Sequence, residues 1–338
     1  MRIETITSAQ NRKVKELLTL GEKSKARSAA GLFVVEGQRE LGHCLDAGFI
    51  PETLFICGEV MTVQNNAVNV AGPKVPKGPC RGREIPLIGV ADVSLRGLGS
   101  PQEGEQKTFW SPSCVGAKTG HLAENIEGKD GLDALIAKAE ALNPRLGVVQ
   151  IPAFLYEKVA YRGSTEGIIA EVHSVSRALE DLRLGESPLV MVLESVEKPG
   201  NLGAVLRSAD AAGADAVIVC DPLTDIWNPN LIRSSVGAVF SVPVAVCTSA
   251  DAIAFLKERG IRILTAQLQD SEWYYDTDMT GATALVMGTE STGLTQAWRD
   301  SADAHIKIPM LGRLDSLNVS VSAAVLLYEA VRQRKGEN

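Results

Sequence analysis

Four polar residues stand where the sequence predicts turns between strands and helices, and they are the side chains best suited to chemistry. Asn201 and Arg207 follow one predicted strand, Glu290 follows another, and Asn318 stands at the entrance of the last predicted helix. They form no metal-ligand spacing and no nucleophile activated by a neighbouring His. Such groups suit a reaction whose difficult step is carried by a cofactor, while the protein positions the substrate and handles a proton. Group transfer fits this set better than hydrolysis.

Two loops near the C-terminus are the best candidates for a ligand pocket. Residues 285–287 and 306–308 are apolar runs bounded by Gly288 and Pro309, as expected of buried parallel strands. In an open α/β sheet, ligands bind at the carboxyl ends of the strands. Two ordinary strand-to-helix connections remain the alternative. The candidate residues are Gly288, Thr289, Glu290, Gly293 and the turn 310–317.

The usual nucleotide and nucleophile fingerprints do not occur. After the strand at residues 189–193, the segment 194–207 reads ESVEKPGNLGAVLR. In it Asn201 suits a helix N-cap, Gly203 permits close backbone approach, and Arg207 lies one turn beyond Gly203, on the same side of the helix. The segment lacks both G-x-G-x-x-G and the P-loop pattern. Neither a Rossmann oxidoreductase nor a P-loop enzyme is supported.

Residues 186–338 alternate apolar strands with helices, which predicts a parallel sheet covered on both faces. The final helix carries a stripe of five apolar residues at helical spacing, which predicts that this stripe, Tyr328 included, faces the core. The stripe consists of Val321, Ala324, Val325, Tyr328 and Val331. The predicted elements are strands at 189–193, 216–220, 242–246 and 262–266, and helices at 202–212, 229–239 and 250–259.

Residues 1–175 predict a smaller α/β domain with a long insertion. Between about 58 and 131 the periodicity fails and Gly and Pro are frequent, so this segment is interpreted as an insertion. The charged segment 176–184 is predicted as a helical linker. The predicted elements are strands at 32–35, 53–57, 146–150 and 167–172, and helices at 38–47, 132–142 and 152–161.

Length and composition predict an ordinary two-domain protein. The 338 residues carry a net charge of −7, which argues against a globally basic nucleic-acid binder but permits a local basic patch. Six scattered cysteines without ligand spacing predict reduced thiols and no metal. The N-terminus lacks a signal-peptide core, and no apolar run approaches the roughly 18 residues of a membrane span. We therefore expect a cytoplasmic protein without a membrane partner.

A short amphipathic helix with a basic face is predicted within residues 8–27. A solvated surface and an RNA contact are both compatible with this charge. Its basic residues are Arg12, Lys13, Lys15, Lys23, Lys25 and Arg27.

Three sequence blocks, taken together, carry a family resemblance. They are N-x-G-x-x-x-R at 201–207, G-x-E-x-x-G at 288–293, and I-P-M followed by S-L-N-V-S-V-S-A within 308–323. In this order they resemble the motifs of the SpoU (TrmH) family of RNA ribose 2′-O-methyltransferases, which depend on S-adenosyl-L-methionine (AdoMet). FVVEGQREL and YRGSTEGIIAEV resemble the N-terminal substrate-binding domain of that family. The resemblance covers most of the chain apart from the insertion.

The resemblance implies an α/β fold of the SPOUT type, in which a trefoil-knot methyltransferase domain follows a small α/β substrate-binding domain. It further implies a homodimer with the active site at the subunit interface. AdoMet is expected against Gly288, Thr289, Glu290, Gly293, Ile308, Pro309, Met310, Leu317, Asn318 and Ser320.

The resemblance also suggests roles for the polar residues. Arg207 is expected to order the ribose hydroxyl and a neighbouring phosphate, because a guanidinium is always protonated and makes a poor base; an RNA phosphate could accept the proton instead. Asn201 and Glu290 are expected to orient Arg207 or the substrate, and Asn318 to line the site. The simpler alternatives are helix caps for the two asparagines and a surface ion pair for Glu290. RNA contacts are expected from Arg12, Lys13, Lys15, Arg39 and Arg162.

Ribosomal RNA is the favoured substrate, and transfer RNA is the nearer alternative. A non-catalytic RNA-binding protein of the same fold is a rival from another class. Titration with AdoMet and with NAD separates these hypotheses from an oxidoreductase.

Overall fold

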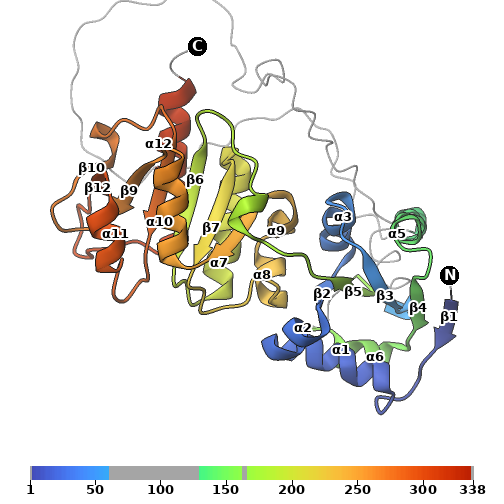
Figure 1. Ribbon diagram of the computed structural model, residues 1–338. Helices are drawn as coiled ribbons and strands as arrows, with labels where there is room; N and C mark the ends of the chain where they lie inside the picture. The colour runs from blue at the N-terminus through green and yellow to red at the C-terminus, as the bar shows by residue number, and fades with distance from the viewer. Residues whose placement is uncertain (1, 61–128, 162–165, 336–338) are drawn as a thin grey trace, which may run out of the picture. The chain divides into compact units, whose positions relative to one another are not determined.

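The computed structural model describes residues 2–60, 129–161 and 166–335 (Figure 1). The predicted insertion is therefore largely outside the described residues, since 61–128 are not among them. The described residues build two sheets, each covered by its own helices. Across these residues no helix is both long and apolar enough to cross a membrane.

The N-terminal sheet has five strands in the order β1-β4-β3-β5-β2. Strand β5 runs antiparallel to both of its neighbours. Helices α1 and α6 pack on one face through Leu17 and Leu155, while α3 and α5 pack on the other through Leu41 and Leu135. The elements are β1 (Arg2–Thr5), α1 (Arg12–Glu22), α2 (Ser24–Ala30), β2 (Leu32–Glu36), α3 (Gln38–Asp46), β3 (Pro51–Ile56), α5 (Lys129–Leu142), β4 (Gly147–Gln150), α6 (Ala153–Val159) and β5 (Ile168–His173).

Helix α1 forms where its sequence provides both a cap and an apolar side. The side chain of Asn11 accepts a hydrogen bond from the backbone N–H of Lys13 at 2.9 Å, which satisfies one of the free donors of the first turn. Val14, Leu17 and Leu20 are buried. Arg12 and Lys15 consequently lie on the exposed side of the helix, while Lys13 reaches Glu4 of β1.

The C-terminal sheet has seven strands in the order β10-β12-β9-β11-β6-β7-β8, and all of its pairings are parallel. Both faces are covered, because α7, α8, α9 and α12 pack on one and α10 and α11 on the other. This confirms the predicted parallel sheet. The elements are β6 (Leu189–Glu194), α7 (Pro199–Ala212), β7 (Ala216–Cys220), α8 (Pro229–Ser234), α9 (Ala238–Ser241), β8 (Val244–Cys247), α10 (Ser249–Glu258), β9 (Arg262–Ala266), β10 (Glu272–Trp273), η3 (Tyr274–Asp276), β11 (Thr283–Met287), α11 (Gln296–Ser301), β12 (Ala304–Lys307) and α12 (Val319–Lys335).

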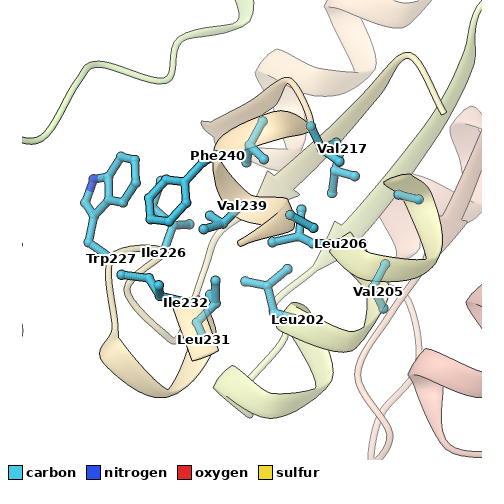
Figure 2. Close-up of a cluster of buried hydrophobic side chains, with 14 of the residues drawn as sticks. Leu202, Val205, Leu206, Val217, Ile226, Trp227, Leu231, Ile232, Val239 and Phe240 are labelled. Carbon is cyan, nitrogen blue, oxygen red and sulfur yellow. The ribbon is translucent and has the colours of Figure 1, made fainter. Parts of the chain in front are cut away.

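Gly203 sets how closely α7 approaches α8. Leu202 and Leu206 of α7 face Leu231 and Phe240 in one buried cluster (Figure 2). A Cβ atom at Gly203 would lie 2.8 Å from the carbonyl oxygen of Leu231 in α8 and 2.8 Å from the backbone nitrogen of Ser235, the residue that caps the end of α8. Only glycine therefore fits here, and the motif glycine serves helix packing.

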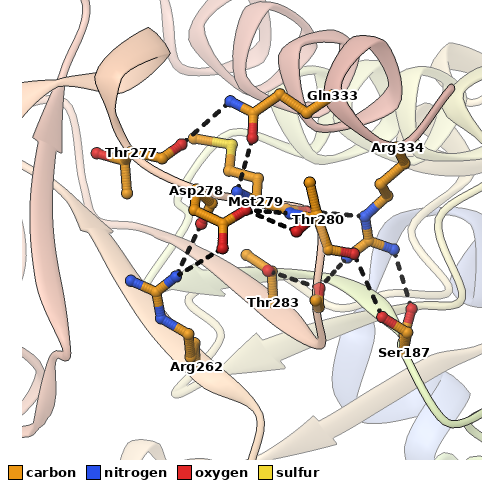
Figure 3. Close-up of polar contacts among 10 residues, drawn as sticks. Ser187, Arg262, Thr277, Asp278, Met279, Thr280, Thr283, Gln333 and Arg334 are labelled. Carbon is orange, nitrogen blue, oxygen red and sulfur yellow. Dashed lines mark hydrogen bonds and ion pairs between the residues drawn. The ribbon is translucent and has the colours of Figure 1, made fainter. Parts of the chain in front are cut away.

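Helix α12 is fastened at its C-terminal end to the loops that precede β6 and β11 (Figure 3). The guanidinium of Arg334 donates to the carbonyl oxygens of Ser187 at 3.0 Å, Met279 at 2.9 Å and Gly281 at 2.6 Å. The side chain of Gln333 accepts from the backbone N–H of Met279 at 2.7 Å. These contacts lie at the amino ends of the strands, so the N-terminus of α12 is directed to the carboxyl edge.

The predicted core-facing stripe of α12 is wrong. Val321 and Tyr328 are exposed, at 48% and 51% of their full surface. Both sides of this helix are apolar, so spacing alone could not identify the side that faces the sheet. The buried apolar residues are instead Val319, Ala323, Leu326, Leu327 and Ala330, and the buried polar residue is Glu329.

Two predicted helices also differ from the structure. The segment 176–184 contains only one short 3₁₀ turn, η2 (Leu179–Asp181). The predicted helix 229–239 is divided into α8 and α9, because Val236 and Gly237 adopt positive φ angles of 55° and 88°. Strand β1 and helix α11 were not predicted, since both are too short to display a periodic pattern.

Candidate active site

Three connections meet at the carboxyl edge of the C-terminal sheet. They follow β6, β11 and β12, and each contains one of the polar residues singled out in the sequence. The side-chain nitrogen of Asn201 donates to Oε1 of Glu290 at 3.0 Å, and that of Asn318 donates to the same oxygen at 2.9 Å. The same side-chain nitrogen of Asn318 also donates to Oδ1 of Asn201 at 3.2 Å. Side chains up to 117 residues apart in sequence thus form one hydrogen-bonded cluster.

Glu290 is the centre of this cluster because both of its carboxylate oxygens are engaged. Oε2 receives Nζ of Lys198 at 2.8 Å, while Oε1 receives the two asparagines. The Lys198 hydrogen bond holds the pKa of Glu290 below its ordinary value, and the same contact raises the pKa of Lys198. Glu290 is therefore an ionised acceptor, which makes it better suited to orienting its partners than to removing a proton.

Asn318 connects the cluster to helix α12. Its Oδ1 accepts from the backbone N–H of Ser320 at 3.0 Å and from the Ser320 hydroxyl at 2.6 Å. This is the geometry of an N-cap. Since the amide oxygen is occupied in this way, the amide nitrogen is directed to Glu290. Asn318 consequently combines a capping role with a place in the cluster.

The loop after β11 is a tight turn that depends on its two glycines. Thr289 and Gly293 exchange backbone hydrogen bonds of 3.2 and 3.1 Å. A Cβ atom at Gly288 would lie 2.3 Å from the carbonyl carbon of Gly293, so no side chain fits there. Gly293 has a φ of 69°, in the left-handed region that favours glycine. The turn can therefore close on itself beside Glu290 only with glycine at position 288.

A cavity of about 150 Å³ opens beside the cluster, and a shallower hollow of about 370 Å³ lies along the exit of β12. The cavity is lined by Val196, Glu197, Lys198, Asn201, Gly288, Thr289, Glu290, Ser291 and Val319. The hollow is lined by Leu268, Trp273, Lys307, Ile308, Met310, Arg313, Leu314 and Asp315. The described residues contain no group of three or more acidic, His or Cys side chains that could hold a metal.

Most of the predicted site residues come together, but Arg207 does not join them. Arg207 is exposed on α7 and makes no hydrogen bond or ion pair with the described residues. Gly203, one turn earlier on the same helix, is buried against α8, whereas the Arg207 side chain lies beyond that contact in solvent. Asn201 is the third residue of α7 and Lys198 is its N-cap residue, so the predicted cap at Asn201 is also wrong.

Other predicted residues occupy different parts of the edge. Ile308 and Met310 line the hollow, Pro309 lies between them, and Leu317 is exposed at 39%. Lys198 was not predicted to belong to the site. A signal for it existed: a proline at the first helical position, Pro199, fixes Lys198 at the helix entrance on the carboxyl edge.

Four of the five residues predicted to contact RNA are described by the structure, and they lie in the N-terminal part. Arg12 pairs with Glu16 at 2.7 Å, Lys13 with Glu4 at 2.5 Å and Arg39 with Glu40 at 2.7 Å. Lys15 is exposed and makes no ion pair with the described residues. Arg162 lies outside the described residues.

Two parts of the chain match models of known protein families. Residues 188–328 match the model of the SpoU rRNA Methylase family, and residues 11–77 match the MRM3-like substrate binding domain. The protein named 23S rRNA (guanosine-2′-O-)-methyltransferase RlmB of Pseudomonas putida is 39% identical over 181 residues, which are 51% of this chain and 73% of that protein. The chain belongs to the SpoU rRNA methylase family. The RlmB protein of Pectobacterium atrosepticum is 36% identical over 220 residues, covering 62% of this chain and 89% of that relative.

Solved structures agree with the family assignment and show the SPOUT fold. A crystal structure described as an RNA 2′-O ribose methyltransferase has a TM-score of 0.66 and 29% identity, and covers 98% of this chain and 100% of its own. An AdoMet-bound rRNA methyltransferase from Sinorhizobium meliloti has a TM-score of 0.72, covers 98% of both chains and is 22% identical. This second likeness concerns the fold alone. The predicted SPOUT domain with a small α/β domain before it is confirmed.

Proposed function

We propose that this SpoU-family protein transfers a methyl group from AdoMet to a ribose 2′-hydroxyl of ribosomal RNA. The observation that carries the proposal is the cluster in which Asn201, Glu290 and Asn318, one from each motif block, meet beside a cavity. The relatives named as 23S rRNA methyltransferases support the choice of substrate.

The carboxyl edge has the shape and the polar groups that AdoMet requires. The turn from Gly288 to Gly293 closes tightly beside the cavity, and the hollow at the end of β12 offers apolar surface from Ile308 and Met310. When bound, AdoMet supplies an electrophilic methyl group on its sulfonium. We assign its binding to Gly288, Thr289, Glu290, Gly293, Ile308, Pro309, Met310, Leu317, Asn318 and Ser320.

The polar cluster would position the acceptor rather than deprotonate it. Glu290 already binds Lys198 and the two asparagines, so it keeps Asn201 fixed at the rim of the cavity. Arg207 is always protonated, so its part is to order the ribose hydroxyl and the adjacent phosphate. The proton can pass to that RNA phosphate as the new bond forms.

A homodimer would explain why Arg207 makes no hydrogen bond with the cluster within the described residues of one chain. The apolar side of α12, with Val321 and Tyr328 half exposed, is a surface that a second copy can cover. Helices α7 and α12 pack together, so Arg207 and this surface belong to the same pair of helices. In a dimer, Arg207 of one protomer would meet the RNA bound at the cluster of its partner.

Three further features belong to the proposal. Strand β11 lies between β9 and β6 although β10 and β12 lie on the other side of β9, and this order supports a trefoil knot. Residues 1–175 would bind RNA through Arg12, Lys13, Lys15, Arg39 and Arg162, and residues 186–338 would carry the chemistry. A ribosomal substrate supports a cytoplasmic location, which is part of the proposal.

The test is methyl transfer by the full-length protein with labelled AdoMet and a 23S rRNA transcript, with tRNA as the second substrate. We expect label at a ribose 2′-oxygen of the rRNA. Arg207→Ala should retain AdoMet binding by calorimetry and lose at least about 100-fold in transfer rate, whereas the exposed-arginine control Arg183→Ala should retain both. Failure of AdoMet to bind favours the non-catalytic alternative, label in tRNA alone overturns the rRNA assignment, and undiminished turnover by Arg207→Ala overturns the role of Arg207.

A further inference from the structure

Glu194 is a buried carboxylate that none of the steps above uses. It is the last residue of β6 and is 2% exposed, and the next residue, Ser195, turns the chain away with a φ of 52°. It forms no ion pair within the described residues. Burying a carboxylate is costly unless hydrogen bonds replace its water, so its surroundings require an explanation.

Three donors surround this carboxylate. Oε2 accepts from the backbone N–H of Thr295 at 2.8 Å, and Oε1 accepts from the Thr295 hydroxyl at 2.7 Å and the Ser249 hydroxyl at 3.1 Å. Ser249 in turn accepts from the indole N–H of Trp298 at 3.0 Å. Both carboxylate oxygens are thus satisfied, and two of the three donors come from Thr295.

Thr295 is the position at which the turn after β11 ends and helix α11 begins. The turn starts beside β6 as well, because Met287 of β11 pairs with Leu193. Leu193 and Glu194 are neighbours in β6, so this strand fixes the start of the turn through its backbone and the end through the Glu194 side chain. The turn between these two anchors carries Glu290.

We propose that Glu194 is a positioning residue for the methyl donor. It holds the 288–294 turn in the shape that keeps Glu290 within reach of Asn201 and Asn318. Glu194 does not line the cavity, so it acts through Thr295 and does not touch a substrate. This inference rests on the proposed function, since it assigns a purpose to the shape of the proposed AdoMet site.

The experiment compares AdoMet affinity, maximal rate and thermal stability in full-length Glu194→Gln. Glutamine keeps the shape of the side chain but replaces one acceptor oxygen with an amide nitrogen. This nitrogen is itself a donor, so it cannot accept the hydrogen bond that the oxygen accepted. We expect AdoMet to bind at least about tenfold more weakly, because the variant loses a charge-assisted hydrogen bond that holds the turn. The rate at saturating AdoMet should stay within about threefold of wild type, because bound ligand restores the turn. Amide exchange should accelerate at residues 288–295.

Two further variants keep the test decisive. Thr295→Ser retains both donors and should bind AdoMet as wild type does, whereas Thr295→Val loses the hydroxyl and should bind several-fold more weakly. These variants also replace Glu194→Gln if that protein does not fold. Glu171→Gln, a buried glutamate of the other sheet, is the matched control and should leave AdoMet affinity unchanged.

The outcomes separate this inference from the proposed function. If wild type binds AdoMet and Glu194→Gln or Thr295→Val binds it equally well, Glu194 is only a structural residue. A Glu194→Gln protein with unchanged affinity but a lower melting temperature leads to the same conclusion. If wild type itself does not bind AdoMet, it is the proposed function that fails.

Discussion

Glu194 and Glu171 are both strand glutamates with less than a tenth of their surface exposed, but their surroundings differ. Glu194 receives three hydrogen bonds, two of them from the residue that ends the motif turn. Glu171 lies in the N-terminal sheet, where burial raises its pKa to about 7 against a hydrogen bond from Thr53 that lowers it. Glu16 and Glu52 raise this pKa further, and Lys13 opposes them.

The comparison teaches that burial of a carboxylate does not by itself indicate a site. What distinguishes Glu194 is the origin of its donors, because they come from a loop that must hold a particular shape. Glu171 has no such loop to hold, and its burial mainly makes the charged form unfavourable. Glu194 holds Thr295 in place through hydrogen bonds, whereas the surroundings of Glu171 make its charged form unfavourable.

The largest effect is expected at Glu290, the exposed carboxylate on the turn that Glu194 anchors. Glu290→Gln should reduce methyl transfer about 1,000-fold, because an amide cannot serve as the charged acceptor of Lys198 and the two asparagines together. The measurement is the single-turnover rate with rRNA. Glu197→Gln, on another carboxylate that lines the same cavity, is the control and should remain near wild type. Equal losses in both variants would mean that the cavity requires only negative charge.

The second prediction concerns stability at Glu171. A carboxyl group whose folded pKa is about 7, above the ordinary 4.5, binds its proton more tightly in the folded state. Its contribution to stability is therefore complete below pH 4.5 and is lost as pH rises through about 7. Glutamine imitates the protonated form, so Glu171→Gln should raise the free energy of unfolding at pH 8 by on the order of 3 kcal/mol. At pH 4.5 the variant and wild type should coincide.

Urea unfolding of both proteins at pH 8 and pH 4.5 measures this difference. The control is Glu157→Gln on α6, because Glu157 is exposed and forms no ion pair with the described residues, and it should show little change at either pH. An equal gain for Glu171→Gln at both pH values would show that packing, and not the buried charge, distinguishes glutamine from glutamate. The contrast between the two buried glutamates would then lose its electrostatic basis.

The sequence predicted the parts of the fold that depend on local pattern. Strands buried on both faces are continuous apolar runs, so β6, β7, β9 and β11 could be located, and their exits identified the edge where Glu290 lies. The motif spacing also placed Asn201 and Asn318 in one site. Their direct contact could not be predicted, because it depends on β11 lying between β6 and β9.

The predictions that failed concern which side chains of a helix are buried, because residue spacing alone does not decide this. Helix α12 is apolar on two sides, and only its neighbours decide that Val321 is exposed and Ala323 buried. Arg207 was expected near Asn201, but helix α7 directs it to solvent. Glu194 resembles any strand residue in sequence, since its three donors come from residues 55 and 101 positions away.

The smallest effect is expected at Lys15, in the region that contains Glu171. Lys15 is exposed on α1 and, among the described residues, it makes no ion pair, so it is available to an RNA phosphate. Lys15→Ala should weaken rRNA binding about threefold and lower the slope of log affinity against log salt by about one. AdoMet affinity should not change, the reverse of the pattern expected for Glu194. Filter binding over a range of salt measures both quantities, with Lys25→Ala on α2 as the control. If Lys15→Ala instead altered AdoMet affinity and left the salt slope intact, RNA binding and cofactor binding would not be divided between the two sheets.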